Sequence, residues 1–106
     1  MGRFISLIAR AGRIAGYDPG RPNQSQNQQL GQHLLRLFEL LQINCVIDVG
    51  ASQGQYGRFL RAIGYRGNII SFEPSGDDYD LLSRLAEKDP RWSTHQLALV
   101  DSDQLA

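Results

Sequence analysis

Two carboxylates flank a glycine-rich stretch near the middle of the chain. Asp48 lies near the end of an apolar run, two residues before Gly50, and Glu73 ends a second apolar run further along. Glycines let a backbone approach a ligand closely, and a helix that starts in such a turn presents free N–H groups. A carboxylate about 20 residues after such glycines binds the ribose diol in dinucleotide-binding folds. The pattern therefore predicts a turn that binds a nucleoside, with Glu73 at the ribose.

The spacing of the glycines does not match the known motifs that bind dinucleotides or phosphates. Gly50, Gly54 and Gly57 do not form the G-x-G-x-x-G fingerprint, because Ser52 occupies the position of the middle glycine, and no Gly-Lys-Ser/Thr follows. The negative charge of Asp48 is a poor neighbour for pyrophosphate. It suits a ligand with a positive centre and an amino group, such as S-adenosyl-L-methionine. A nicotinamide-nucleotide-binding domain of an oxidoreductase remains the less favoured alternative.

Elements that would position these residues alternate along the chain. The hydrophobic patterns predict strands at 43–49, 68–73 and 92–100, and helices at 30–42, 55–63 and 75–88. Gly64 is expected to end the second helix, and Ser75 to cap the third with Asp78 as its capping-box partner. This order predicts an α/β chain: a partial Rossmann-like fold with a three-stranded parallel sheet in the order 3-2-1, flanked by helices.

The first 29 residues are expected to lie apart from the domain that spans 30–106. Residues 3–15 have apolar side chains at helical spacing among three arginines, which predicts a short basic helix docked on the domain. A weak contact of this helix with a membrane surface is the alternative. Residues 16–29 are rich in Pro, Gly, Gln and Asn, and are interpreted as a linker.

Composition excludes some classes of partner and site. Lys and Arg together number 11, and so do Asp and Glu. The chain therefore lacks the excess of basic residues that would indicate a nucleic-acid partner. No apolar run approaches the roughly 20 residues that span a bilayer. The single cysteine, Cys45, is expected to be buried, and alone it cannot build a zinc site. These features fit a cytoplasmic location.

Beyond its spacing, the motif is similar to that of a known family. The stretches "VIDVGASQGQYGRFLRAIGYRGNIISFEPSGDDYDLLSR" and "HQLALVDSD" resemble the FkbM family of class I S-adenosylmethionine-dependent methyltransferases. The D-V-G-A-N-x-G-Q-[FY] motif of that family matches residues 48–56, with Ser52 where Asn is usual. Its F-E-P motif matches residues 72–74, and its A-L-x-D stretch matches residues 98–101. The resemblance covers residues 30–103.

The resemblance implies transfer of a methyl group from S-adenosyl-L-methionine to a hydroxyl of a sugar or other natural product, the acceptor being a small molecule or a glycolipid. Asp48 and the Gly50–Gly54 loop would hold the methionine part of the cofactor, Glu73 the ribose, and Asp101 the adenine edge. His95 is a candidate general base only by its residue type. The cofactor-binding residues expected in this way are Asp48, Gly50, Ala51, Ser52, Gly54, Gln55, Tyr56, Glu73 and Asp101.

The chain departs from the family because nothing in it matches a later K-x-D-x-E-G-like segment. We therefore expect a truncated, cofactor-binding half that transfers no methyl group by itself. Strand 43–49 would then have an exposed edge through which chains self-associate. Two further alternatives stay open. The chain is a non-catalytic remnant or interaction module, or Asp48, Glu73 and the glycines serve only the geometry of the turns.

Overall fold

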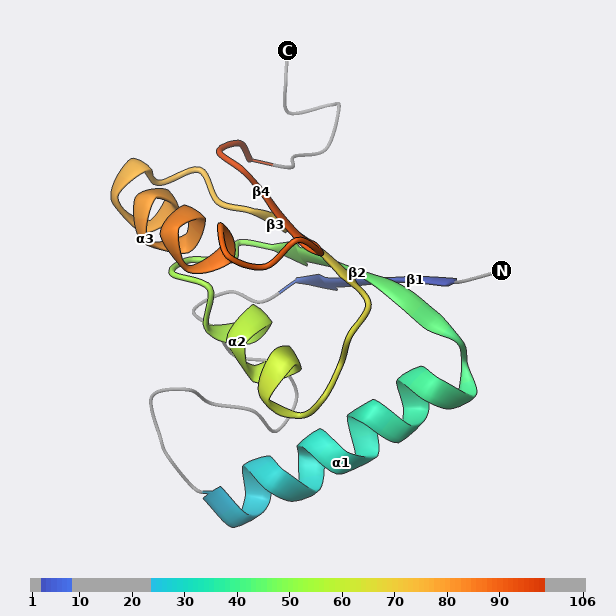
Figure 1. Ribbon diagram of the computed structural model, residues 1–106. Helices are drawn as coiled ribbons and strands as arrows, with labels where there is room; N and C mark the ends of the chain where they lie inside the picture. The colour runs from blue at the N-terminus through green and yellow to red at the C-terminus, as the bar shows by residue number, and fades with distance from the viewer. Residues whose placement is uncertain (1–2, 9–23, 99–106) are drawn as a thin grey trace.

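The computed structural model describes residues 3–8 and 24–98, with side chains described from Gln28 to Ala98. Within these ranges, four strands form one parallel sheet in the order β1-β2-β3-β4 (Figure 1). The predicted α/β class, with a parallel sheet and flanking helices, is confirmed. The elements are β1 Arg3–Ile8, α1 Gln24–Leu40, β2 Ile43–Val49, α2 Gln55–Ala62, β3 Asn68–Phe72, α3 Gly76–Ala86 and β4 Trp92–His95.

Strand β1 corrects the prediction for the N-terminal segment. Residues 3–8 were expected in a helix but pair in parallel with β2, with Leu7 opposite Asp48 in the register. A short apolar run is compatible with either element, and the unpaired edge of β2 offers hydrogen-bonding partners that favour the strand. The expected exposed edge of strand 43–49 is therefore wrong, and so is the three-stranded count. Residues 9–15 of the expected helix lie outside the described residues.

Helix α1 is longer than predicted. It begins at Gln24, so the expected linker is wrong for residues 24–29, where glutamines favour a helix, while 16–23 lie outside the described residues. Phe38 is buried at 2% exposure and Leu35 packs against the core, whereas Leu37 is 45% exposed.

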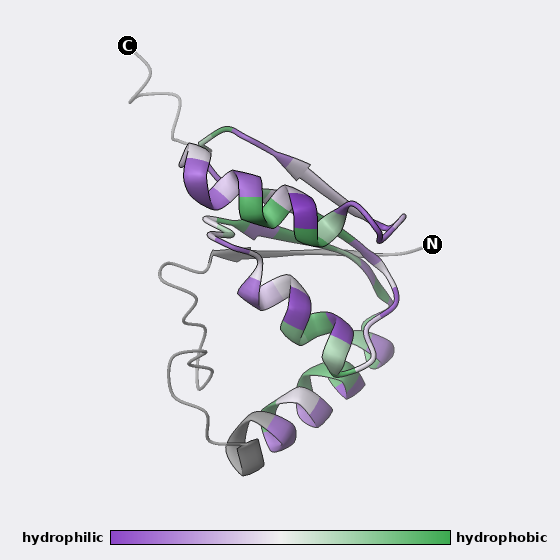
Figure 2. Cartoon of the chain, turned by 60° about the vertical axis from the view of Figure 1, so that its left-hand side comes forward, coloured by the Kyte–Doolittle hydropathy of each residue, from purple (hydrophilic) through white to green (hydrophobic). Residues whose placement is uncertain are grey.

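The hydrophobic core lies on one face of the sheet. Val46, Ile69 and Trp92 are register partners on three adjacent strands, so their side chains point to the same side. All three belong to one buried cluster, which also takes a residue from each helix: Phe38, Leu60 and Leu82. Helices α1, α2 and α3 therefore all pack on this face (Figure 2).

The opposite face of the sheet has no helix within the described part of the chain. Its apolar side chains are Ile47 and Val49 on β2 and Ile70 and Phe72 on β3, and all four are only half-buried. Phe72 stacks on His95 of β4, with ring centroids 5.4 Å apart. Cys45, also on this face, is buried as predicted. Within residues 24–98, these side chains form an apolar surface without a covering helix, which we call the open face.

The ends of the later elements match the predictions in part. Gly64 adopts a positive φ of 103° just after α2, as its expected role in ending the helix requires. Ser75 is the N-cap of α3, but its side chain makes no capping hydrogen bond, so the expected capping box with Asp78 is absent. Strand β4 ends at His95, earlier than the predicted residue 100.

Candidate functional site at the carboxyl end of the sheet

The glycine-rich loop and Glu73 lie at the same edge of the sheet because the parallel strands β2 and β3 both end there. The loop crosses from β2 to α2 with three residues in the left-handed region: Gly50 at φ 71°, Ser52 at φ 53° and Gly54 at φ 92°. Only glycine adopts this conformation without steric cost. Gly50 and Gly54 are therefore explained by the path of the loop, and Ser52 is a strained exception.

Every backbone amide of this loop donates a hydrogen bond within the protein. The N–H groups of Gly50 and Ala51 both donate to the carbonyl of Phe72, at 3.0 Å each. Ser52 donates to Glu73, the Gln53 amide to the Gln55 side chain, and Gly54 to the Ala51 carbonyl. A phosphate-binding loop needs such N–H groups to point at its ligand. This loop has none to spare between residues 50 and 54.

Glu73 is tied to the backbone through both of its carboxylate oxygens. Its Oε1 accepts the Ser52 N–H at 2.7 Å, and its Oε2 accepts the Ser75 N–H at 2.9 Å. The side chain is only 7% exposed. Glu73 thus joins the loop to the start of α3, which is the structural role left open from the sequence. A ribose diol would have to use the second lone pair of each oxygen.

Asp48 is the other carboxylate, and it is fully buried at 0% exposure. Its Oδ2 accepts a hydrogen bond from the Ser71 hydroxyl at 3.3 Å, and Ser71 Oγ accepts one from Trp92 Nε1 at 2.9 Å. An indole N–H only donates, so Ser71 Oγ is the acceptor in the bond with Trp92, and the Ser71 hydroxyl donates to Asp48 when that carboxyl is ionised. Among the described residues, Asp48 Oδ1 has no hydrogen-bond partner.

Burial makes the charge on Asp48 expensive. It raises the pKa of the Asp48 carboxyl to about 6, and the nearby charge of Glu73 adds to this rise while the Ser71 hydrogen bond opposes it. A buried carboxylate oxygen without a donor is costly unless a proton or a cationic group meets it. At this end of the sheet, the described residues thus leave one oxygen of the buried Asp48 carboxyl without a hydrogen-bond donor or a cation.

Two of the glycines are needed for packing rather than for a ligand. A Cβ at Gly54 would lie 2.7 Å from Leu85 Cδ2, and one at Gly57 would overlap the ring of Trp92. Both contacts are with side chains of the protein itself. The spacing of Gly54 and Gly57 therefore reflects the close approach of α2 to α3 and β4.

The remaining predicted residues are distributed unevenly. Ala51 and Tyr56 are buried in the core cluster, and Gln55 uses its side-chain oxygen within the loop. His95 is exposed on the open face, opposite to the side that Asp48 occupies, so it is not brought to the site. Asp101 lies outside the described residues. Asp48, Gly50, Ser52, Gln55 and Glu73 are the predicted residues that the structure gathers around the loop.

Three residues at the site were not predicted there. Ser71 and Trp92 form the hydrogen-bonded chain to Asp48, and Asp78 accepts a hydrogen bond from the Gln53 side chain at 3.1 Å. Ser71 had a signal in the sequence, because it is a polar residue inside the apolar strand "NIISF". Trp92 and Asp78 had none, since their contacts depend on how α3 and β4 pack.

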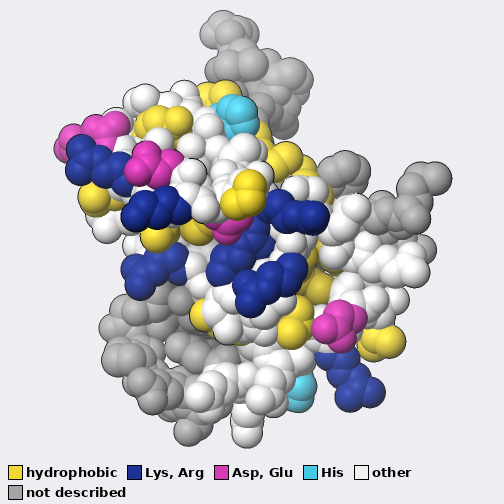
Figure 3. Space-filling model, viewed as in Figure 1, with side chains coloured by type: hydrophobic (Ala, Val, Ile, Leu, Met, Phe, Trp, Pro, Cys, Tyr) yellow, Lys and Arg dark blue, Asp and Glu magenta, His cyan; other side chains and the backbone are white. Residues whose placement is uncertain are grey.

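Carboxylates contact the loop from the α3 side. Asp77 and Asp78 lie in the first turn of α3, and Asp78 accepts hydrogen bonds from the Ser52 and Gln53 side chains of the loop. Figure 3 shows acidic side chains at the upper left, over α3, with Lys and Arg side chains beside them and across the middle of this view. At the loop itself, the carboxylates of Asp78 and Glu73 favour a cationic ligand over an anionic one.

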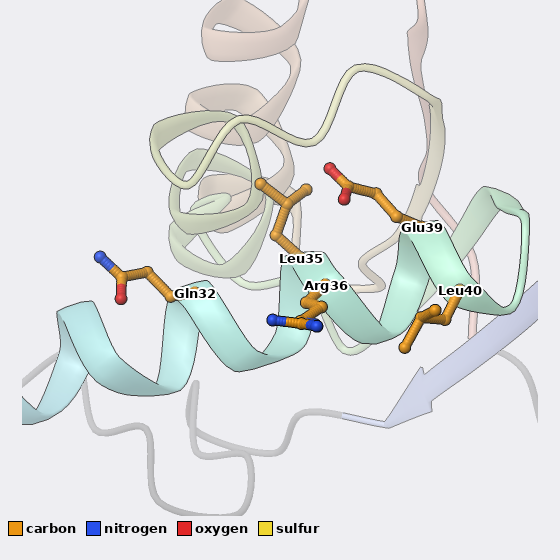
Figure 4. Close-up of a pocket in the computed structure, with 5 residues that line it drawn as sticks. All are labelled: Gln32, Leu35, Arg36, Glu39 and Leu40. Atoms are coloured by element: carbon orange, nitrogen blue, oxygen red, sulfur yellow. The ribbon is translucent and has the colours of Figure 1, made fainter.

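Pockets lined by described residues also occur away from this loop. One lies along α1 and is lined by Gln32, Leu35, Arg36, Glu39 and Leu40 (Figure 4). Its described lining comes from one helix, so it does not gather groups from separate elements. Another lies on the open face near Cys45, at the opposite end of the strands from Asp48. We assign no function to either of these two pockets.

Comparisons of the chain with family models, with curated proteins and with solved structures gave no match. We therefore infer the function from the residues and from the geometry of the loop. Within the described residues, no helix combines the length and the apolar character needed to cross a membrane.

Proposed function

We propose that this chain is the cofactor-binding part of a Rossmann-like, FkbM-type methyltransferase and binds S-adenosyl-L-methionine at the carboxyl end of its sheet. The observation that carries the proposal is the buried Asp48, whose Oδ1 lacks a partner among the described residues beside a glycine-rich loop. A sulfonium or α-amino group would give this carboxylate the cationic partner that the described residues do not provide.

The loop geometry favours this ligand over a dinucleotide. All five amides from Gly50 to Gly54 are used within the protein, so a pyrophosphate would find no N–H donors there. S-adenosyl-L-methionine has no phosphate and does not require them. The carboxylates of Asp77 and Asp78 would repel an anionic ligand at the same place.

Binding requires a small rearrangement, because Asp48 has no solvent contact. The loop must shift for a ligand to reach Oδ1, and Gly50, whose φ is positive, allows such a change at low cost. Glu73 limits the movement, since it fastens Ser52 to the start of α3. In this proposal Glu73 both holds the loop and receives the ribose hydroxyls.

The reaction would be an in-line displacement at the sulfonium methyl group, promoted mainly by positioning of the two substrates. The acceptor would be a hydroxyl of a sugar, another small molecule or a glycolipid. His95, the candidate general base by residue type, lies on the other face of the sheet from Asp48 and is not brought to the site. The contribution of this chain is thus cofactor binding.

A non-catalytic interaction module is the second candidate. The observation that favours it is the open face, where the half-buried side chains of β2 and β3 form an apolar surface without a described helix. Affinity for S-adenosyl-L-methionine separates the two candidates, because an interaction module would not bind it.

Calorimetric titration of the chain with S-adenosyl-L-methionine tests the proposal through Glu73. The Glu73→Ala variant should bind about 10- to 100-fold more weakly, as expected for the loss of hydrogen bonds to a charged group. Glu87→Ala is the matched control, because Glu87 is exposed at the other end of α3 and should bind like the parent chain. Equal affinities for both variants, with circular dichroism unchanged, would remove Glu73 from the site.

A further inference from the structure

Asp48 combines complete burial with incomplete hydrogen bonding. Its Oδ2 has one long bond from Ser71, and its Oδ1 has no partner among the described residues. The Ser71 hydroxyl, which also accepts the Trp92 N–H, has a single proton and can therefore donate at most one hydrogen bond to an ionised Asp48. The described protein therefore supplies one donor where a carboxylate accepts several.

The surrounding charges do not compensate for this shortage. Glu73 is the charged group that acts on Asp48, and it has the same sign. Asp78 of α3 is also acidic and binds the Ser52 and Gln53 side chains on the loop. On α2, the side chain that points into the core near the loop is Tyr56, whereas Arg58 is exposed. Strand β4 contributes only the neutral indole of Trp92.

We propose that in mildly acidic solution the fully buried Asp48, whose Oδ1 has no described partner, carries a proton while the loop is closed over it, and that binding of the cationic cofactor expels this proton. The inference rests on the proposed function, because it concerns the same ligand at the same site. A cation beside Oδ1 favours the ionised carboxylate, whereas the closed apolar surroundings favour the neutral acid. Ligand charge and proton thus compete for one oxygen.

The pKa of Asp48 determines how strongly the affinity for the cofactor should depend on pH. Burial raises the pKa of Asp48 to about 6, so the free chain is largely protonated at pH 5.0 and largely ionised at pH 6.8. If the bound state keeps Asp48 ionised, the affinity should be about tenfold weaker at pH 5.0 than at pH 6.8. The amino and carboxyl groups of the cofactor change little in charge over this range.

Calorimetry of S-adenosyl-L-methionine binding at pH 5.5, in two buffers with different heats of ionisation, measures the released proton. The chain should carry His33→Gln and His95→Gln, both at exposed positions, so that the measured proton cannot come from an imidazole. We expect release of most of one proton per bound ligand. Asp48→Asn in the same background should bind more weakly, because the carboxylate charge is lost, and its remaining binding should show no proton release and no dependence of affinity on pH.

The proton can also be followed without ligand. Trp92 is the only tryptophan, and its indole N–H is hydrogen-bonded to Ser71, which contacts Asp48. Its indole resonance should therefore shift with pH around a midpoint near 6 in the free double-histidine variant, and not in the Asp48→Asn variant. Ser71→Ala removes the donor to Asp48 and should move the affinity profile to higher pH.

The outcomes separate this inference from the proposed function. If the chain binds the cofactor without releasing a proton at pH 5.5, the coupling is wrong and the proposed function stands. If the Trp92 resonance does not titrate between pH 5 and pH 7, Asp48 does not hold the proton, whatever the ligand does. If the Trp92 resonance titrates as expected but no cofactor binds, the proposed function fails, and the coupling to this ligand fails with it.

Discussion

At the scale of single residues, Asp48 links the stability of the fold to pH. The pKa of its carboxyl is about 6 in the folded chain and near 3.9 in an unfolded one. The folded chain therefore binds the proton more tightly between these values, and the free energy of unfolding falls as pH rises through this window.

The first prediction is that Asp48→Asn removes this dependence. Relative to the parent, the variant should gain on the order of 2–3 kcal/mol at pH 7, where the parent holds a buried charge, and lose this advantage near pH 4. Urea unfolding at both pH values measures the difference. A difference in unfolding free energy between parent and variant that is the same at pH 4 and at pH 7 would contradict the burial argument for Asp48.

The second prediction concerns the backbone of the loop. Gly50→Ala should destabilise the fold by about 1–2 kcal/mol, because a side chain at φ 71° is strained, and Ser52→Gly should stabilise it by relieving the same strain at φ 53°. Gly76→Ala is the control, since its Cβ would make only an ordinary 3.5 Å contact with Gln96 Nε2. Equal unfolding midpoints for Gly50→Ala and Gly76→Ala would show that the loop conformation is wrong.

The types of the site residues could be predicted from the sequence, but their partners could not. Asp48 and Glu73 stood out because charged residues ended apolar runs. Both Glu73 oxygens accept backbone N–H groups because of the path of the loop and the position at which α3 begins. Residue types alone determine neither of these. Ser71 was recognisable only as a polar residue within a strand, and its bond to Asp48 required the register of β2 and β3.

At the scale of elements, the strands and helices from residue 30 to residue 95 were predictable because their hydrophobic periods are clear and glycines punctuate them. The segment Arg3–Ile8 was not, because six residues are too few to distinguish a helical period from a strand. Its conformation is decided by pairing with β2, which is a contact across more than thirty residues of sequence.

The third prediction uses two neighbouring residues of β3. Ile69 points into the helix-covered core at 1% exposure, whereas Ile70 points to the open face and is half-buried. Ile69→Ala should therefore cost about 2–4 kcal/mol of unfolding free energy, and Ile70→Ala clearly less. Denaturant unfolding of the two variants measures this ratio directly. Equal losses would mean that both faces of the sheet are covered to the same extent.

At the scale of the whole molecule, the described chain is covered by helices on one side only. The expected edge of β2 is closed by β1, so a route to self-association predicted from the sequence is blocked. The open face stays as an apolar surface of β2 and β3.

The fourth prediction is that deletion of residues 1–8 restores the unpaired edge and increases self-association at equal concentration. Sedimentation velocity measures this effect. Phe72→Lys, made in both the parent and the deleted chain, serves as the control, since it places a charge on the open face without touching the edge of β2. If the deleted chain sediments like the parent, pairing of β1 with β2 does not protect the edge. If Phe72→Lys abolishes the association, the open face is its cause.

The fifth prediction addresses the central claim that this end of the sheet binds S-adenosyl-L-methionine. Backbone amide resonances of the ¹⁵N-labelled chain should be recorded while the cofactor is added, with a nicotinamide dinucleotide as the comparison ligand. The account predicts saturable shifts for residues 48–56 and 73–78, where the loop and the start of α3 meet, and much smaller ones with the dinucleotide. A folded chain that shows no shifts with S-adenosyl-L-methionine, or shifts confined to other residues, would contradict it.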